Sequence, residues 1–168
     1  MNIFYLDSNP RICARYHCDK HVIKMMLESA QLLCTALNIV SGTQVTPYKS
    51  THINHPCSIW VRESFDNWAW TFNLMLELEK EWQYRFNHNR QHLAISKLAV
   101  CEPYGYLLPI YAGRVGMLPH RGFTSPALVM PDYCKIPSDP IASYRNYYNL
   151  EKKHIHNWTN REVPEWIV

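Results

Sequence analysis

The segment YHCDKHVIKMMLESAQLL, from Tyr16 to Leu33, gathers residue types that carry out acid–base chemistry. If the segment forms one helix at about 100° per residue, six polar side chains share a face opposite an apolar stripe. These six are His17, Lys20, His21, Lys24, Glu28 and Gln31. Glu28 lies well inside the expected helix, next to Met25, Met26 and Leu27, and a partly desolvated carboxylate is typical of a general acid or base.

The same polar face has three other interpretations. It can be the solvated side of an ordinary helix. His17 and His21 have the i, i+4 spacing of helical zinc ligands, with His52 and His55 as further donors. However, no HExxH motif is present, and two nearby lysines would repel a cation. Either lysine, Lys20 or Lys24, can also act as a Schiff-base nucleophile beside a carboxylate.

Helical periodicity dominates the chain outside this segment. Asn9 and Pro10 have the pattern of an N-cap and first helical residue, and predict one helix from there to about Leu37. A second helix is expected from His55 to Phe86 and a short third from His92 to Ala99. A further helix follows Ser138-Asp139-Pro140 and contains IASYRNYYNLEKK.

The region from about 101 to 139 is rich in proline, glycine and tyrosine and lacks a helical period. A loop of this length inside a compact domain is usually functional. We therefore predict an all-α fold in which residues 1–168 form a compact single domain of three or four helices with one long ordered loop, about 101–139.

Composition limits the functional classes. With 168 residues and 47% hydrophobic content the chain suits one domain. Its six cysteines form no CxxC pair, so we expect small buried side chains in a reducing compartment. A net charge of +3 permits contact with nucleic acid without requiring it. No apolar run approaching roughly 20 residues and no signal peptide are evident, which predicts a cytoplasmic protein.

Four motifs, in collinear order, resemble the phage-type pyrimidine-dimer DNA glycosylase/AP-lyase family, the endonuclease V of T-even phages. Asp19, Lys20 and His21, with Glu28 seven residues after His21, are similar to the family's Asp-x-His and its catalytic glutamate. NHPCSIW opens a helix ending in LELEKEWQYRF, as a family helix does after Gly-His. SPALVMPDYCKIPSDP resembles the segment before the last family helix, and YRNYY resembles the family's Trp-Tyr-Lys-Tyr-Tyr motif at the DNA surface.

The resemblance implies a mechanism without a metal or cofactor. In the family the α-amine of the chain attacks C1′ of the damaged nucleotide, the imine releases the base, and β-elimination breaks the strand. Carried over, Glu28 would assist the proton transfers, Met1 would supply the amine, and His21 would orient substrate or Glu28. The implied protein is a phage DNA-repair enzyme working in the host cell cytoplasm, with DNA as its partner.

This chain departs from the family pattern at several positions. The family exposes a threonine after methionine removal, whereas this chain begins Met1-Asn2. Where the family has arginines that hold phosphates, this chain has Asn2, Leu27 and Gln31. Lysines on other turns would then grip the DNA, so the substrate need not be a pyrimidine dimer.

The segment YRNYYNLEKKHIHNWTNR mixes aromatic and cationic side chains, a mixture that can stack bases and hold phosphates. The alternative is that its aromatic residues fill a core. The expected nucleic-acid-binding residues are His17, Lys20, Lys24, His55, Arg62, Tyr144, Arg145, Tyr147 and Tyr148.

The leading hypothesis is therefore a DNA glycosylase/AP lyase acting on damaged or modified DNA. Two rivals remain from the sequence. One is a non-catalytic phage factor that binds nucleic acid or protein, because a fold can persist after catalysis is lost. The other is a hydrolase or nuclease with a metal held by histidines.

Overall fold

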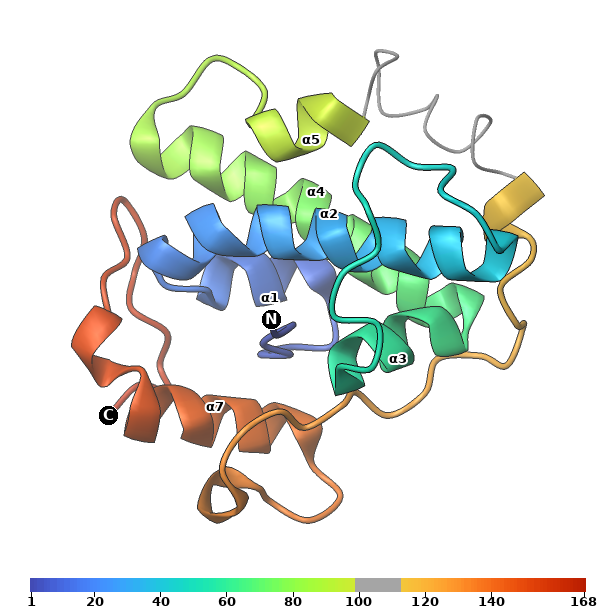
Figure 1. Ribbon diagram of the computed structural model, residues 1–168. Helices are drawn as coiled ribbons and strands as arrows, with labels where there is room; N and C mark the ends of the chain where they lie inside the picture. The colour runs from blue at the N-terminus through green and yellow to red at the C-terminus, as the bar shows by residue number, and fades with distance from the viewer. Residues whose placement is uncertain (99–112) are drawn as a thin grey trace.

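The computed structural model describes residues 1–98 and 113–168, and the regular structure in these two ranges is helical (Figure 1). The α-helices are α1 (Pro10–Tyr16), α2 (Asp19–Ser41), α3 (Pro56–Glu63), α4 (Phe65–Phe86), α5 (Leu93–Leu98) and α7 (Pro140–Glu151), with short 3₁₀ helices η2 (Asp132–Cys134) and η3 (Lys153–Ile155). The all-α prediction is confirmed. The prediction of three or four helices is wrong, because two of the expected helices are each divided in two.

The first division separates α1 from α2. Asn9 caps α1 as expected, since its side-chain oxygen accepts hydrogen bonds from the backbone N–H groups of Arg11 and Ile12. At His17 and Cys18 the backbone is extended, with ψ of 134° and 160°. Both side chains are fully buried there. His17 therefore precedes α2 and does not belong to its polar face.

The second division lies at Ser64. Its backbone is extended, at φ −148° and ψ 157°, and its hydroxyl accepts a hydrogen bond from the N–H of Asn67. The N–H of Phe65 is satisfied by the carbonyl of Pro119 instead of a helical partner. Ser64 thus ends α3 and starts α4 in a new direction.

The later part of the chain follows the prediction more closely. Helix α5 matches the expected short helix up to Leu98, and Ala99 lies outside the described residues. Of the expected loop 101–139, residues 101–112 also lie outside them. The described part is irregular apart from a helical turn at 113–115 and η2. Asp139 caps α7 through its side chain, as the capping signature indicated.

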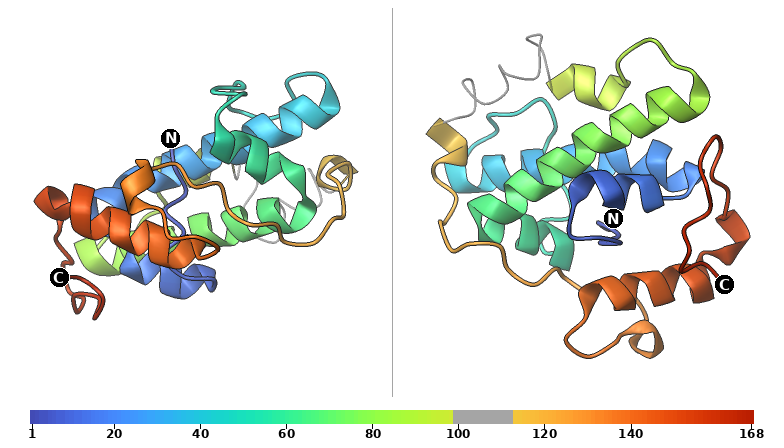
Figure 2. Two further views of the ribbon diagram at one scale, coloured as in Figure 1. Left: turned by 90° about the horizontal axis from the view of Figure 1, so that it is seen from below. Right: turned by 180° about the vertical axis from the view of Figure 1, so that it is seen from behind.

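Helices α2 and α4 pack against each other at the centre of the molecule, with α1 and α3 also packed against α4. Helix α7 lies at the far edge, and the N-terminal segment runs between it and α2 (Figures 1 and 2). The core is formed mainly by α2 and α4, and its largest buried apolar side chains include Met25, Met26, Leu32, Leu74, Met75 and Leu78. The five cysteines in the described residues are buried and free, as expected.

Helix α2 has the length and apolar composition of a membrane span, contrary to the expectation that no such run exists. In the structure, 67% of that window is buried inside the protein. A buried core helix passes the same test of length and composition, so the finding does not place the protein in a membrane.

Candidate active site

The N-terminus of the chain meets Glu28 of α2. The Met1 amine lies 3.8 Å from Oε2 of Glu28, and the backbone N–H of Asn2 donates to the same oxygen at 3.0 Å. Nζ of Lys24, one turn earlier on α2, lies 3.1 Å from Oε1. The Glu28 side chain is 13% exposed, so the carboxylate is largely shielded from water but still reachable.

The Met1 side chain is turned inward. It is only 3% exposed and packs against the core, yet the residue as a whole is half-buried. The exposed area of Met1 therefore belongs mainly to its main-chain atoms.

Asn2 fixes the direction of the N-terminal segment. Its Oδ1 accepts hydrogen bonds from the backbone N–H groups of Ile3 and Phe4, and its Nδ2 donates to the carbonyl of Val129 at 2.9 Å. Phe4 then adopts a left-handed backbone, at φ 42°. Sequence reasoning had treated Asn2 only as a missing arginine, and no local pattern predicts a contact with residue 129.

The first turn of α3 forms another wall of the site. His55 is the N-cap, and its Nδ1 accepts a hydrogen bond from the N–H of Cys57 at 3.2 Å. Burial lowers the pKa of His55, as do the positive N-terminal amine and His52, whereas Glu28 raises it. Burial also raises the pKa of the Cys57 thiol to about 12, so this cysteine is not a thiolate nucleophile.

His21 lies in an aromatic cluster with Phe4 and Tyr148. Its ring stacks on Phe4 with centroids 4.1 Å apart, and its Nδ1 is 2.5 Å from the hydroxyl of Tyr148. Burial, followed by the charges of His17, Lys152 and Lys24, lowers the pKa of His21 to about 2. Its hydrogen bond within the described residues goes to α7, so His21 supports the N-terminal segment and is not bonded to Glu28.

Several expected DNA-binding residues are parts of the core. His17, Tyr144 and Tyr148 are each 0% exposed. The Nδ1–H of His17 donates to the carbonyl of Cys13, and the hydroxyl of Tyr144 donates to the carbonyl of Ala127. Sequence reasoning placed them at the DNA surface because aromatic and cationic residues alternate, but burial of the aromatic rings decided their side.

Two expected DNA-binding arginines have internal partners. Arg145 donates to the carbonyl of Leu6 at 3.0 Å, and its guanidinium lies 5.3 Å from the ring centroids of both Tyr16 and Trp166. Nη1 of Arg62 donates to the carbonyl of Ile53 at 2.6 Å. Both side chains therefore hold loops in place.

The cations and rings that stay accessible near the N-terminal segment come from α2 and α7. Lys20 and Lys24 are exposed on α2. Tyr147 of α7 is half-buried, with its ring nearly parallel to that of Phe4 at 6.1 Å. Nζ of Lys152 lies 4.7 Å from the Tyr147 centroid. Lys24 thus reaches the site through Glu28, and Tyr147 with Lys152 lies against Phe4 of the N-terminal segment.

In the two described ranges, no three His, Cys, Asp or Glu side chains lie close enough together to hold a metal ion. The rings of His17 and His21 are 6.3 Å apart and nearly perpendicular. Nδ1 of His52 instead pairs with the hydroxyl of Thr51.

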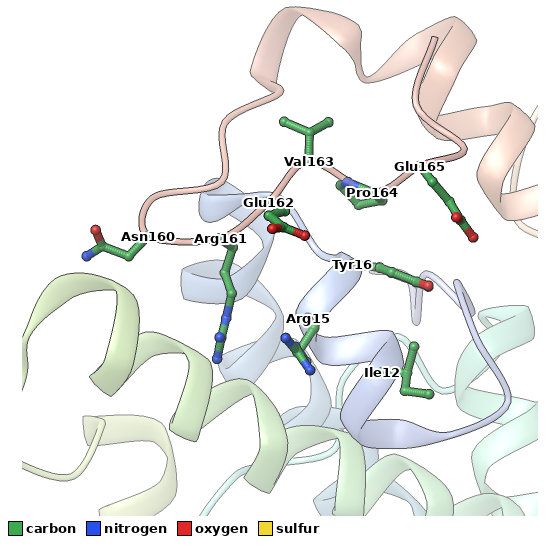
Figure 3. A pocket seen from close by; sticks show the side chains of 9 residues that line it. All are labelled: Ile12, Arg15, Tyr16, Asn160, Arg161, Glu162, Val163, Pro164 and Glu165. Carbon is green, nitrogen blue, oxygen red and sulfur yellow. The ribbon is translucent and has the colours of Figure 1, made fainter.

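A pocket lies elsewhere, between α1 and the C-terminal tail (Figure 3). Its volume is about 660 Å³, and its lining shares no residue with the Glu28 site. Its lining contains the positive side chains of Arg15 and Arg161 and the negative side chains of Glu162 and Glu165. Among these, Arg161 is already paired with Glu81. The chemistry-bearing groups described above therefore lie outside this pocket.

Comparisons with protein-family models, with curated proteins and with solved structures each gave no match.

Proposed function

We propose that this protein is a DNA glycosylase/AP lyase that acts on damaged or modified DNA through an imine. The observation that carries the proposal is the 3.8 Å approach of the Met1 amine to the carboxylate of Glu28. These two groups are 27 positions apart in the chain, and the fold brings them together. A nucleophile within reach of a shielded carboxylate is the minimal apparatus for imine chemistry.

The chemistry follows from these two groups. Neutral amine nitrogen attacks C1′ of a damaged nucleotide and displaces the base, which leaves with a proton. The C1′–O4′ bond then opens, O4′ takes a proton, and the imine forms between the amine and C1′. With an abasic aldehyde the amine adds to C1′ and water leaves to give the same imine. A base then removes a proton from C2′, and the electron pair expels the 3′ phosphate oxygen from C3′. Glu28 serves as the proton acceptor and as the counter-charge to the iminium, and no cofactor is required.

The surroundings suit a nucleic-acid substrate. Lys20 and Lys24 are exposed on α2, and Tyr147 of α7 packs against Phe4 of the N-terminal segment, with Lys152 over its ring. Ammonium groups hold phosphates, and a half-exposed aromatic ring can stack on a base. Such a surface would hold the backbone while the target nucleotide leaves the stack, a step that costs a few kcal/mol.

Borohydride trapping tests the proposal. The protein is mixed with duplex DNA that contains one abasic site, borohydride is added, and a covalent protein–DNA band is sought. An N-terminally extended form, in which the amine is converted to an amide, is run in parallel. We expect a band with the native N-terminus and none with the extended form.

Other outcomes would contradict the proposal in different ways. A band that persists in the extended form would move the nucleophile to a lysine, with Lys20→Gln and Lys24→Gln the variants to examine. No band despite measurable DNA binding would exclude the lyase reaction and favour a non-catalytic nucleic-acid-binding factor.

A further inference from the structure

A second hollow adjoins the pocket of Figure 3 and is lined by α1, α4 and the C-terminal tail. Its volume is about 560 Å³, and Arg15 of α1 and Arg161 of the tail line both hollows. The acidic residues Glu162 and Glu165 line only the first hollow. Four basic and two acidic side chains line the second, and these are Arg11, Arg15, Lys80, Arg161, Glu77 and Glu81. The second hollow therefore has a surplus of two positive charges.

Both carboxylates of the second hollow are neutralised within the protein. Glu77 pairs with Lys80, three residues later on α4. Glu81 pairs with Arg85 at 3.0 Å and with Arg161 at 2.8 Å, and its side chain is only 7% exposed. Neither carboxylate is therefore free to neutralise the other basic side chains of the lining.

Arg11 and Arg15 supply the surplus charge. They lie one turn apart on α1 and are both exposed, and among the described residues neither guanidinium has an ion-pair partner. Side chains at this spacing are neighbours on the helix surface. A guanidinium can donate two parallel N–H groups to one phosphate. The two arginines together therefore suit a ligand that carries consecutive phosphates.

An exposed aromatic ring lines the same hollow. Tyr84 is 54% exposed, and Cζ of Arg161 lies 3.9 Å from the centroid of its ring. Arg161 is held in turn by Glu81, to which it donates two hydrogen bonds of 2.9 and 2.8 Å. The guanidinium thus fixes the ring while much of the ring stays accessible. An aromatic ring of this kind can stack on a nucleobase.

We propose that this second hollow binds single-stranded nucleic acid, with Arg11 and Arg15 on consecutive phosphates and Tyr84 stacked on a base. A basic groove with an aromatic side chain is the combination that holds single strands. Inorganic phosphate or an acidic protein segment would use the arginines alone, and a duplex keeps its bases stacked on each other. The hollow shares no residue with the Glu28 site, so this contact goes beyond the proposed function and does not depend on it.

Two variants separate the charge from the stacking. Arg11→Gln/Arg15→Gln removes both unpaired guanidinium groups, and Tyr84→Leu removes the ring. All three side chains are exposed, so the fold should survive both changes. Arg114→Gln/Arg121→Gln is the matched control, because it removes the same charge from two exposed arginines that do not line the hollow.

Fluorescence anisotropy measures the affinity for a labelled oligothymidine of about 12 nucleotides, a length that single-strand sites commonly cover. We expect Arg11→Gln/Arg15→Gln to raise the dissociation constant roughly 10-fold or more. The slope of log K against log salt should become shallower by about 1.4, since each phosphate contact with a single strand contributes about 0.7. Tyr84→Leu should raise the dissociation constant roughly 10-fold without changing the slope. The control should change it less than about 3-fold.

Wild-type binding by Arg11→Gln/Arg15→Gln, or an equal loss in the control, would overturn the inference. Competition tests the class of ligand, because unlabelled oligothymidine should displace the labelled strand, whereas inorganic phosphate or poly-glutamate at the same charge concentration should not. Displacement by phosphate together with wild-type binding by Tyr84→Leu would mean a small-anion site. The same result with poly-glutamate would mean an acidic protein partner, and either would overturn the inference. The oligothymidine has no abasic site, so these results are independent of borohydride trapping.

Discussion

At the scale of single residues, Glu28 is distinguished by the donors around it. Oε2 faces the chain terminus and receives the N–H of Asn2, while Oε1 faces the exposed ammonium of Lys24. The carboxylate thus joins the buried N-terminal segment to the solvent-facing side of α2. If the Glu28 carboxylate had only a structural role, a neutral amide of the same shape could replace it. Substitution by glutamine therefore distinguishes a structural role from a chemical one.

Glu28→Gln should abolish imine formation while leaving the fold intact. Glutamine can still accept the N–H of Asn2 through its oxygen but can neither take a proton nor offset an iminium. We expect trapping to fall by roughly 100-fold or more, with a change in unfolding free energy below about 1 kcal/mol. Glu77→Gln, which neutralises a carboxylate of α4 that pairs with Lys80, is the control. Wild-type trapping by Glu28→Gln would contradict the assignment.

His17 gives the protein a pH-dependent stability. Burial lowers its pKa from 6.5 to about 4, and its Nε2 is buried without a hydrogen-bond partner. Below pH 6.5 the unfolded chain binds a proton that the folded chain refuses, so the free energy of unfolding falls as pH drops from 6.5 to about 4. The shift corresponds to roughly 3 kcal/mol across that window.

Urea unfolding at several pH values measures this effect. His17→Asn is the matched variant, because its amide can still donate to the carbonyl of Cys13 but does not titrate. We expect the variant to show a shallower slope between pH 6.5 and 4. The remaining slope comes from the other histidines whose pKa is lowered in the fold, which are His21, His55, His92 and His156. Identical slopes for both proteins would show that His17 does not titrate on unfolding.

At the scale of elements, the two interruptions of the helices create the site. Because α1 ends at Tyr16, α2 can begin at Asp19 in a different direction from α1. Because Ser64 interrupts the second predicted helix, α3 packs against α2 as well as α4, while α4 stays in the core.

Ser64→Ala tests the second interruption. The hydroxyl of Ser64 accepts the N–H of Asn67 at 3.1 Å and is 0% exposed, so its loss leaves a buried donor without its cap. We expect a loss of about 1–2 kcal/mol in unfolding free energy. Ser96→Ala, on an exposed turn of α5, should change stability by less than about 0.5 kcal/mol. Equal effects in the two variants would argue against the cap.

At the scale of the whole molecule, a buried ionic network ties the C-terminal tail to the helices. Arg85 of α4 contacts Asp19 at 3.1 Å and Glu81 at 3.0 Å, and also donates to the carbonyls of Arg15 and His17. From the tail, Arg161 pairs with Glu81, while Asn157 and Thr159 donate to the carboxylate of Asp19. The start of α2 is therefore fixed by residues near both ends of the chain.

Arg85→Met should destabilise the protein strongly. The Arg85 side chain is 0% exposed, and its removal would leave two carboxylates and two carbonyls with fewer partners. Breaking a buried ion pair in this way costs about 3–5 kcal/mol. Thermal unfolding of Arg85→Met against Arg11→Met, an exposed site on α1, measures it. A loss below about 1 kcal/mol would show that the network adds little.

Much of the helical plan was accessible to sequence reasoning because it is local. Asn9, Gly42 and Asp139 cap helices through their own side chains or backbone, and each marks a helix end in the structure. Apolar spacing likewise predicted the buried stripe with Val22, Met26 and Ala30. Ser64 was missed because serine also occurs inside helices, and only the packing of Phe65 near Pro119 shows it as a cap.

By itself the sequence determined the all-α class and the outer ends of several helices, and a resemblance of motifs suggested Glu28 and Met1 as partners. Tertiary structure decided which polar residues stayed accessible. His17, His21, Tyr144 and Tyr148 carry the same residue types as a DNA-binding surface, yet they pack inward, whereas Lys20 and Lys24 do not. Periodicity places a side chain on a face of its own helix, but only the packing of other elements determines whether that face meets water.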